Sequence, residues 1–142
     1  MKQSLVATAT VTLKASNPQI WHALLDPEMI KKYMFGTTVT SDWQVGSTIT
    51  WAGDYKGKRY SDHGLILHVD RGRQLKYSHF SPAEGKLDLP ENYHTVTINL
   101  STEGARTVLT LSQDNNPTEA ARQESEKNWQ TMLENLKKVL EG

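Results

Sequence analysis

The sequence contains no cysteine among its 142 residues. Disulfide bonds, thiolate nucleophiles and metal sites with cysteine ligands are therefore excluded, and a reducing compartment suits the chain. A net charge is missing too, because 16 basic residues balance 16 acidic ones, and no basic block offers nucleic acid or an anionic membrane a binding surface. We therefore expect a cytoplasmic protein with no nucleic-acid partner.

Long apolar runs are also absent. The N-terminal stretch MKQSLVATATVTL is too polar and too regularly alternating for a signal peptide. Nowhere do about 20 apolar residues follow one another, as a membrane-spanning helix requires. Because no repeat, low-complexity tract or linker divides the chain, we expect no membrane span and one domain over residues 1–142 with an ordinary hydrophobic core.

The spacing of apolar residues predicts an α+β fold. Residues 3–13 alternate as in a half-buried strand, and Ser16 and Pro18 then begin two short helices that end at Gly36. The pattern next returns to period two and predicts six strands, at about 37–43, 46–55, 58–70, 74–80, 92–101 and 105–113. The run Asn116-Pro117-Thr118-Glu119 resembles a helix cap and predicts a last helix of about 25 residues, which would cover the apolar face of a seven-strand antiparallel sheet.

Three segments resemble a known family. They are ASNPQIWHALLDPEMIKKYM (15–34), HGLILHVDRGRQLKYSHF (63–80) and NWQTMLENLKKVLE (128–141). Their order and spacing resemble the family named after the C-terminal domain of the activator of Hsp90 ATPase, within the START/Bet v 1-like helix-grip superfamily. The resemblance spans nearly the whole chain.

This resemblance implies a fold and a range of functions. The fold is a curved sheet that grips the C-terminal helix, usually with a cavity between them, and many relatives bind apolar or amphipathic small molecules there. Some helix-grip relatives are enzymes. The co-chaperone that names the family has a separate N-terminal domain, which these segments do not resemble, so Hsp90 activation is not carried over to particular residues.

Three histidines are expected on the helix side of the sheet. His63 shares its parity with Leu65, His79 shares it with Tyr77, and His94 lies on the apolar parity of its own strand. Short turns near residues 57, 72 and 104 would bring these strands into register. The row predicted across one end of the sheet is Trp51, His63, His79, His94 and Gln113. The loop over 81–91 could cover this opening or simply extend into solvent.

The last helix is expected to lie opposite this row of residues and to form the second wall of a cavity. Its apolar stripe comprises Trp129, Met132, Leu133, Leu136, Val139 and Leu140, and the residues from 132 onward should clamp the helix to the sheet. Towards the N-terminus the stripe continues with Ser125, Arg122, Ala121 and Thr118, which are small or polar. We therefore expect a cavity under the first half of this helix, with Trp129 at its border. The candidate ligand-binding residues are Trp51, His63, Tyr77, His79, His94, Ala121, Ser125 and Trp129.

Several functions remain open at this level. We expect binding of an apolar or amphipathic, lipid-like small molecule. The alternatives are an enzyme that uses the histidines for general acid–base chemistry and a chaperone-associated interaction module. Each histidine could instead be a hydrogen-bonded core residue, and the three together could hold zinc, although no catalytic residue, metal ligand or cofactor is assigned. The chain is expected to be a monomer or a weak homodimer.

Overall fold

The structure is a computed structural model that describes residues 5–55 and 57–141. Its strands are β1 (Leu5–Leu13), β2 (Thr38–Thr40), β3 (Thr48–Tyr55), β4 (Lys58–Asp70), β5 (Gln74–His79), β6 (His94–Glu103) and β7 (Arg106–Asn116). Its helices are α1 (Asn17–Leu25), α2 (Pro27–Tyr33) and α3 (Glu119–Glu141), with short turns η1 (Pro82–Glu84) and η2 (Pro90–Asn92). The α+β plan is confirmed. Residues 3 and 4 of the expected first strand lie outside the described residues.

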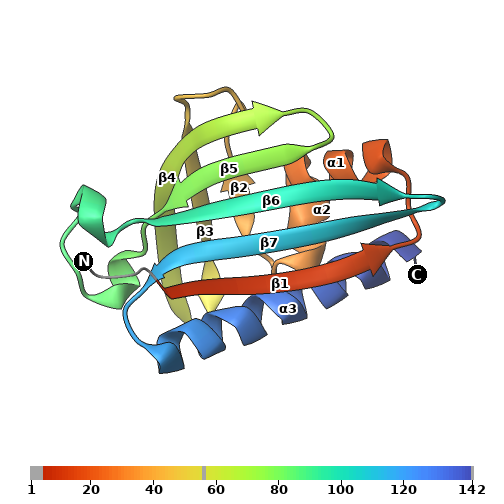
Figure 1. Ribbon diagram of the computed structural model, residues 1–142. Helices are drawn as coiled ribbons and strands as arrows, with labels where there is room; N and C mark the ends of the chain where they lie inside the picture. Colours follow the sequence, from red (N-terminus) through yellow and green to blue (C-terminus); the bar gives the residue numbers. More distant parts are fainter. Residues whose placement is uncertain (1–4, 56, 142) are drawn as a thin grey trace.

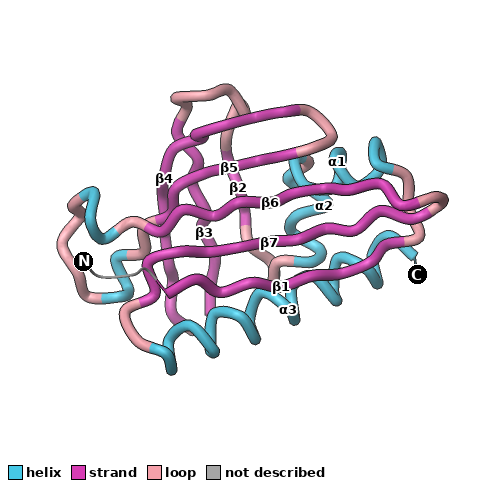
Figure 2. Tube along the Cα trace, in the orientation of Figure 1, coloured by secondary structure: helices cyan, strands magenta, loops and turns pink. Residues whose placement is uncertain are grey.

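All seven strands form one antiparallel sheet, in the order β1-β7-β6-β5-β4-β3-β2. The sheet curves over α3, which runs along β1, while α1 and α2 lie at the other end from the β5–β6 loop (Figure 1). The turns η1 and η2 belong to that loop, which projects from the end of the sheet (Figure 2). The expected helix-grip arrangement is therefore present.

The core lies between the inner face of the sheet and the helices. Leu109 and Leu111 of β7 are fully buried, and so are Leu133 and Leu136 of α3. Burying a leucine side chain contributes about 1.5–3 kcal/mol to stability. The C-terminal half of the apolar stripe thus holds α3 on the sheet, as the sequence predicted.

Local capping explains where the helices begin. At α1, the Ser16 hydroxyl accepts a hydrogen bond from the backbone N–H of Gln19, and the Gln19 side chain accepts one from the backbone N–H of Ser16. At α3 the expected cap is wrong. Thr118, not Asn116, accepts the N–H of Ala121, at 3.0 Å. Asn116 instead ends β7 and donates to the carbonyl of Leu5, so the helix starts two residues later than the proline suggested.

A bulge in β4 changes the face on which its residues lie. Ile66 pairs with Tyr77 of β5 and His68 pairs with Lys76, which leaves Leu67 as an extra residue. Before the bulge the even-numbered residues face inward, and Ile66 is 1% exposed. Leu65 and Leu67, which the uninterrupted alternation predicted to be inner residues, are 46% and 41% exposed. A one-residue shift exchanges the two faces of a strand, which is why that prediction is wrong.

Candidate functional site

The bulge separates the predicted histidines onto two faces. His63 lies on the outer face, away from α3, and this corrects the inward orientation predicted for it. Trp51 faces Asp62 across the β3–β4 pair, so Asp62 takes the place expected for His63. His79 pairs directly with His94, as in the row predicted across the sheet.

An aromatic hollow occupies the inner face, with a volume of about 150 Å³. It is lined by Met34, Thr37, Trp51, Tyr60, Asp62, Tyr77, His79 and Trp129. The ring of Trp51 lies 5.2 Å from that of Tyr77 and 4.9 Å from that of His79, between centroids. Four of the eight predicted residues therefore meet here, from strands β3 and β5 and from helix α3. Burial raises the pKa of Tyr77 far above its ordinary value, so this phenol stays protonated.

A histidine–aspartate contact lies among these rings. His79 Nε2 is 2.9 Å from Asp62 Oδ2, and the two side chains are 25% and 15% exposed. A carboxylate only accepts hydrogen bonds, so Nε2 carries the proton in this contact. The other oxygen of Asp62, Oδ1, is buried and has no hydrogen-bond partner among the described residues. The hollow thus contains a free acceptor beside an oriented imidazole.

A second hollow, of about 350 Å³, lies under the start of α3 and is lined by His94, Ala121 and Ser125 among others. The imidazole of His94 is 5% exposed and lies 6.2 Å from that of His79. Its Nδ1 is 2.9 Å from the carbonyl of Asp114, and its Nε2 is 3.0 Å from Glu84 Oε1. Both partners accept hydrogen bonds, so the two bonds exist together only when both ring nitrogens are protonated.

A polar network joins β7 to α3 between the two hollows. The indole N–H of Trp129 donates to Gln113 Oε1 at 2.6 Å, and Ser125 Oγ donates to Asn116 Oδ1 at 3.0 Å. Ser125 therefore has a bonding partner as well as a place beside the hollow. Gln113 pairs with Val96, so it lies two residues further along the strand pair than the predicted position opposite His94. Trp129 separates the packed half of α3 from the half above the hollows.

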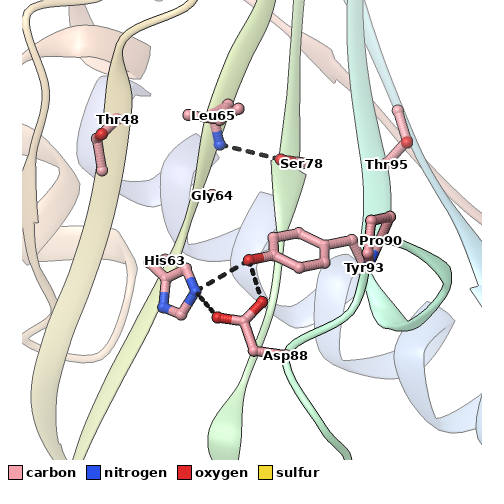
Figure 3. Close-up of a pocket in the computed structure, with 9 residues that line it drawn as sticks. All are labelled: Thr48, His63, Gly64, Leu65, Ser78, Asp88, Pro90, Tyr93 and Thr95. Carbon is pink, nitrogen blue, oxygen red and sulfur yellow. Dashed lines mark hydrogen bonds and ion pairs between the residues drawn. The ribbon is translucent and has the colours of Figure 1, made fainter.

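The outer face carries a larger pocket, of about 580 Å³, which contains His63. His63, Asp88 and Tyr93 point towards one another there (Figure 3). His63 Nε2 is 2.9 Å from Asp88 Oδ2 and 3.0 Å from the Tyr93 hydroxyl, which donates to Asp88 Oδ1 at 2.5 Å. Sequence reasoning grouped His63 with the wrong neighbours and missed this cluster.

The electrostatics of this cluster follow from its hydrogen bonds. The Tyr93 hydroxyl, helped by His63, lowers the pKa of the Asp88 carboxyl below its ordinary value. The same carboxylate raises the pKa of Tyr93 to about 12. At neutral pH the site therefore holds an ionised aspartate and a protonated tyrosine.

A common metal site for the three histidines is not present in the described part of the chain. No group of three or more histidine, aspartate or glutamate side chains there could hold a metal ion. His63 is separated from His79 and His94 by the sheet itself. Each histidine is paired instead with its own carboxylate.

The carboxylate partners are the residues that the sequence did not reveal. Glu84 and Asp88 come from the 81–91 loop, whose path no periodic pattern fixes. Asp62 could have been found, because Gly64 inside a strand signals a bulge or a close backbone approach. Placing a bulge at that point would have turned Asp62 inward and His63 outward.

Comparison with known proteins identifies relatives of this fold. A solution structure of a protein from Cytophaga hutchinsonii is 52% identical, with a TM-score of 0.87 over 99% of this chain and 97% of that one. The solution structure of the Aha1 dimer from Colwellia psychrerythraea is 20% identical, with a TM-score of 0.74 over 96% of both chains. A protein in the dynemicin biosynthetic locus is 15% identical, with a TM-score of 0.81 over 98% of this chain and 48% of that one. The last two share the fold alone.

The family is identified by sequence. No curated protein matches the chain. None of the helices in residues 5–55 and 57–141 is long and apolar enough to cross a membrane. The model of the family described as Activator of Hsp90 ATPase homolog 1-like protein matches residues 14–141, which confirms the predicted resemblance. The chain belongs to this family.

Proposed function

We propose that the protein binds a small amphipathic molecule between the inner face of the sheet and the first half of α3. The observation that carries the proposal is the unpaired Oδ1 of Asp62, which is buried in a hollow lined by aromatic rings. Leaving a buried acceptor unpaired costs about 1–3 kcal/mol. A ligand that donates a hydrogen bond to this oxygen would offset that cost.

The lining favours a particular kind of ligand. Trp51, Tyr77 and Trp129 offer flat apolar surfaces, and Asp62 with His79 offers one polar end. Ligand pockets commonly measure about 300–1,000 Å³. The aromatic hollow is smaller, at about 150 Å³, so a larger ligand would also occupy the 350 Å³ hollow beside Ala121 and Ser125. Such a ligand would have to displace the hydrogen bond from Trp129 to Gln113.

The comparisons agree with this kind of function. One protein of the same fold is described as belonging to the dynemicin biosynthetic locus, a setting of small-molecule biosynthesis. This setting suits a small organic molecule as the ligand of the present chain. Without cysteines, the chain suits the cytoplasm as its place of action. Because a relative of this fold is an Aha1 dimer, a weak homodimer remains part of the proposal.

General acid–base catalysis in the same hollow is the second candidate. It is favoured by the contact between His79 Nε2 and Asp62, which fixes the tautomer and leaves Nδ1 without a hydrogen bond among the described residues. A histidine held in this way can accept a proton from a bound substrate. Turnover of an identified ligand that disappears in His79→Gln, while binding persists, would establish this reaction.

Binding can be tested without knowing the ligand in advance. Native mass spectrometry and thermal-shift measurements would screen fatty acids, aromatic compounds and polyketide-like polyphenols. For any ligand found, Asp62→Asn removes the carboxylate, and Ala121→Phe fills the second hollow. Asn128→Phe is the matched control, because Asn128 is exposed on the same helix.

We expect the two site variants to weaken binding about tenfold or more and the control to bind like the wild type. The proposal fails if no class of compound binds. It also fails if a compound binds equally well to all four proteins.

A further inference from the structure

We propose that the outer face carries a second ligand site, independent of the inner hollow, which takes an uncharged phenol or alcohol with its hydroxyl donating to Nδ1 of His63. The pocket has a volume of about 580 Å³, and its lining includes His63, Leu65, Ser78, Asp88, Pro90 and Tyr93. This inference does not depend on the function proposed for the inner face.

The tautomer of His63 is fixed from one side. Its Nε2 contacts both Asp88 Oδ2 and the Tyr93 hydroxyl, and the proton of that hydroxyl is already donated to Asp88 Oδ1 (Figure 3). Nε2 therefore donates, since a carboxylate can only accept. In the neutral ring Nδ1 is then an acceptor, and no partner for it is present within residues 5–55 and 57–141. Nδ1 can therefore accept a hydrogen bond from the O–H group of a ligand.

The site is held rigidly from below. Phe80 is 3% exposed, and its ring stacks on that of Tyr93 with centroids 5.1 Å apart. It also contacts the ring of His63, at 5.4 Å. The backbones of His63 and Phe80 exchange two hydrogen bonds, of 3.1 and 2.7 Å. A ligand would thus meet a preformed imidazole, with little ordering to be done on binding.

The rest of the lining suits the body of a phenol or alcohol. Leu65 is 46% exposed and lines the pocket, as does Pro90. Ser78 Oγ accepts the backbone N–H of Leu65 at 2.9 Å, so its own proton is free to be donated. A hydroxylated ring would therefore find an apolar surface and a second polar contact.

The negative charge of Asp88 disfavours anionic ligands at this site. Asp88 is ionised at neutral pH, Tyr93 keeps its proton, and the site carries a net negative charge whenever His63 is neutral. A carboxylate or phosphate would be repelled by Asp88 and would also lack the proton that Nδ1 accepts.

Three probe molecules test separately the need for a ring, for a hydroxyl donor and for an uncharged ligand. p-Cresol has both the ring and the hydroxyl, toluene lacks the donor, and p-toluate replaces it with an anion. Binding would be followed by amide NMR of uniformly labelled protein, at a pH where the ring spectra show His63 to be neutral. The amides of Gly64, Leu65 and Thr95 report on the outer pocket, and the indole of Trp129 reports on the inner hollow.

We expect p-cresol to shift the outer amides and to bind about tenfold more tightly than toluene, the value of one hydrogen bond of about 1.4 kcal/mol. p-Toluate should leave the outer amides unchanged. Equal binding of p-cresol and toluene, stronger binding of p-toluate, or shifts confined to Trp129 would each overturn the proposal.

A substitution in the loop tests the tautomer directly. In Asp88→Asn the Tyr93 hydroxyl can still donate to the amide oxygen, so the amide N–H₂ faces His63 and makes Nε2 the acceptor. The proton then moves to Nδ1, and we expect p-cresol affinity to fall about tenfold, with the ring nitrogen shifts of His63 exchanged. Glu91→Gln is the control, because it removes the same charge from the same loop at a position away from His63. It should change neither the p-cresol affinity nor the ring nitrogen shifts of His63. If Asp88→Asn binds p-cresol like the wild type, Nδ1 is not the acceptor and the site is not as proposed.

Discussion

Replacing Gly64 by alanine tests how the two faces of β4 are positioned. A Cβ at this glycine would lie 1.8 Å from the carbonyl oxygen of Ser78 and 2.5 Å from its carbonyl carbon. Both atoms belong to the backbone of β5, so no side-chain rotation relieves the contact. The strands would have to separate where Asp62 faces inward and His63 faces outward.

The cost can be estimated from the contact. Inserting a methyl group into a packed region usually costs about 1–3 kcal/mol, when side chains can adjust. Here backbone must move, so we expect about 3 kcal/mol or more, a large part of the 5–15 kcal/mol that stabilises a typical domain. The melting temperature would fall by about 10 °C.

Urea unfolding followed by tryptophan fluorescence would measure this cost, with an unchanged slope as the check on two-state behaviour. Gly53→Ala is the matched control in β3. Its added Cβ would meet Tyr60 Oη at 2.6 Å, the far end of a flexible side chain, so we expect a loss of about 1 kcal/mol, at the lower end of that range. If Gly64→Ala were no more destabilising than Gly53→Ala, the close approach of β4 and β5 would not exist.

Three other predictions concern the core and the histidine–carboxylate pairs. Leu136→Ala empties a fully buried position under α3 and should cost about 2–5 kcal/mol in urea unfolding, and a loss below 1 kcal/mol would contradict the clamp described for this helix. Because the fold favours the protonated phenol of Tyr93, its contribution to stability is complete below the ordinary pKa of about 10 and lost as pH rises through about 12. NMR titration of its ring carbon should show that pKa of about 12 in the wild type and a lower one in Asp88→Asn; an unchanged value would refute the assigned hydrogen bond. Glu84→Ala removes one of the two partners of His94, so the ring nitrogen shifts of His94 should change, whereas unchanged shifts would argue against their bond.

The fold could be predicted where periodicity is uninterrupted. In β1 the apolar residues alternate from Ala7 to Leu13, and the structure buries each of them. The start of α3 was harder, since both Asn116 and Thr118 are good caps and only tertiary contacts show that Asn116 bonds to Leu5. Sequence also placed Trp129 at the border of the packed stripe, where its indole N–H now contacts Gln113.

The candidate site could be predicted only in part, because its geometry depends on one bulge. Alternation placed His63 with Leu65 on the inner face, and the extra residue Leu67 reverses both. His79 and Tyr77 were placed correctly, since β5 has no such irregularity in its pairing with β6. Asp88 could not have been placed, because it lies in a loop whose position is set by the contacts it makes.

The indole N–H signal of Trp129 gives the most direct test of ligand binding on the inner face. This N–H donates to Gln113 Oε1, beside the hollow that contains the unpaired oxygen of Asp62. When a ligand found by screening is added, we expect this signal to shift in proportion to occupancy, and the shift to be lost in Ala121→Phe but kept in Asn128→Phe. A ligand that binds while the Trp129 signal and the amides around Asp62 stay unchanged would contradict the account.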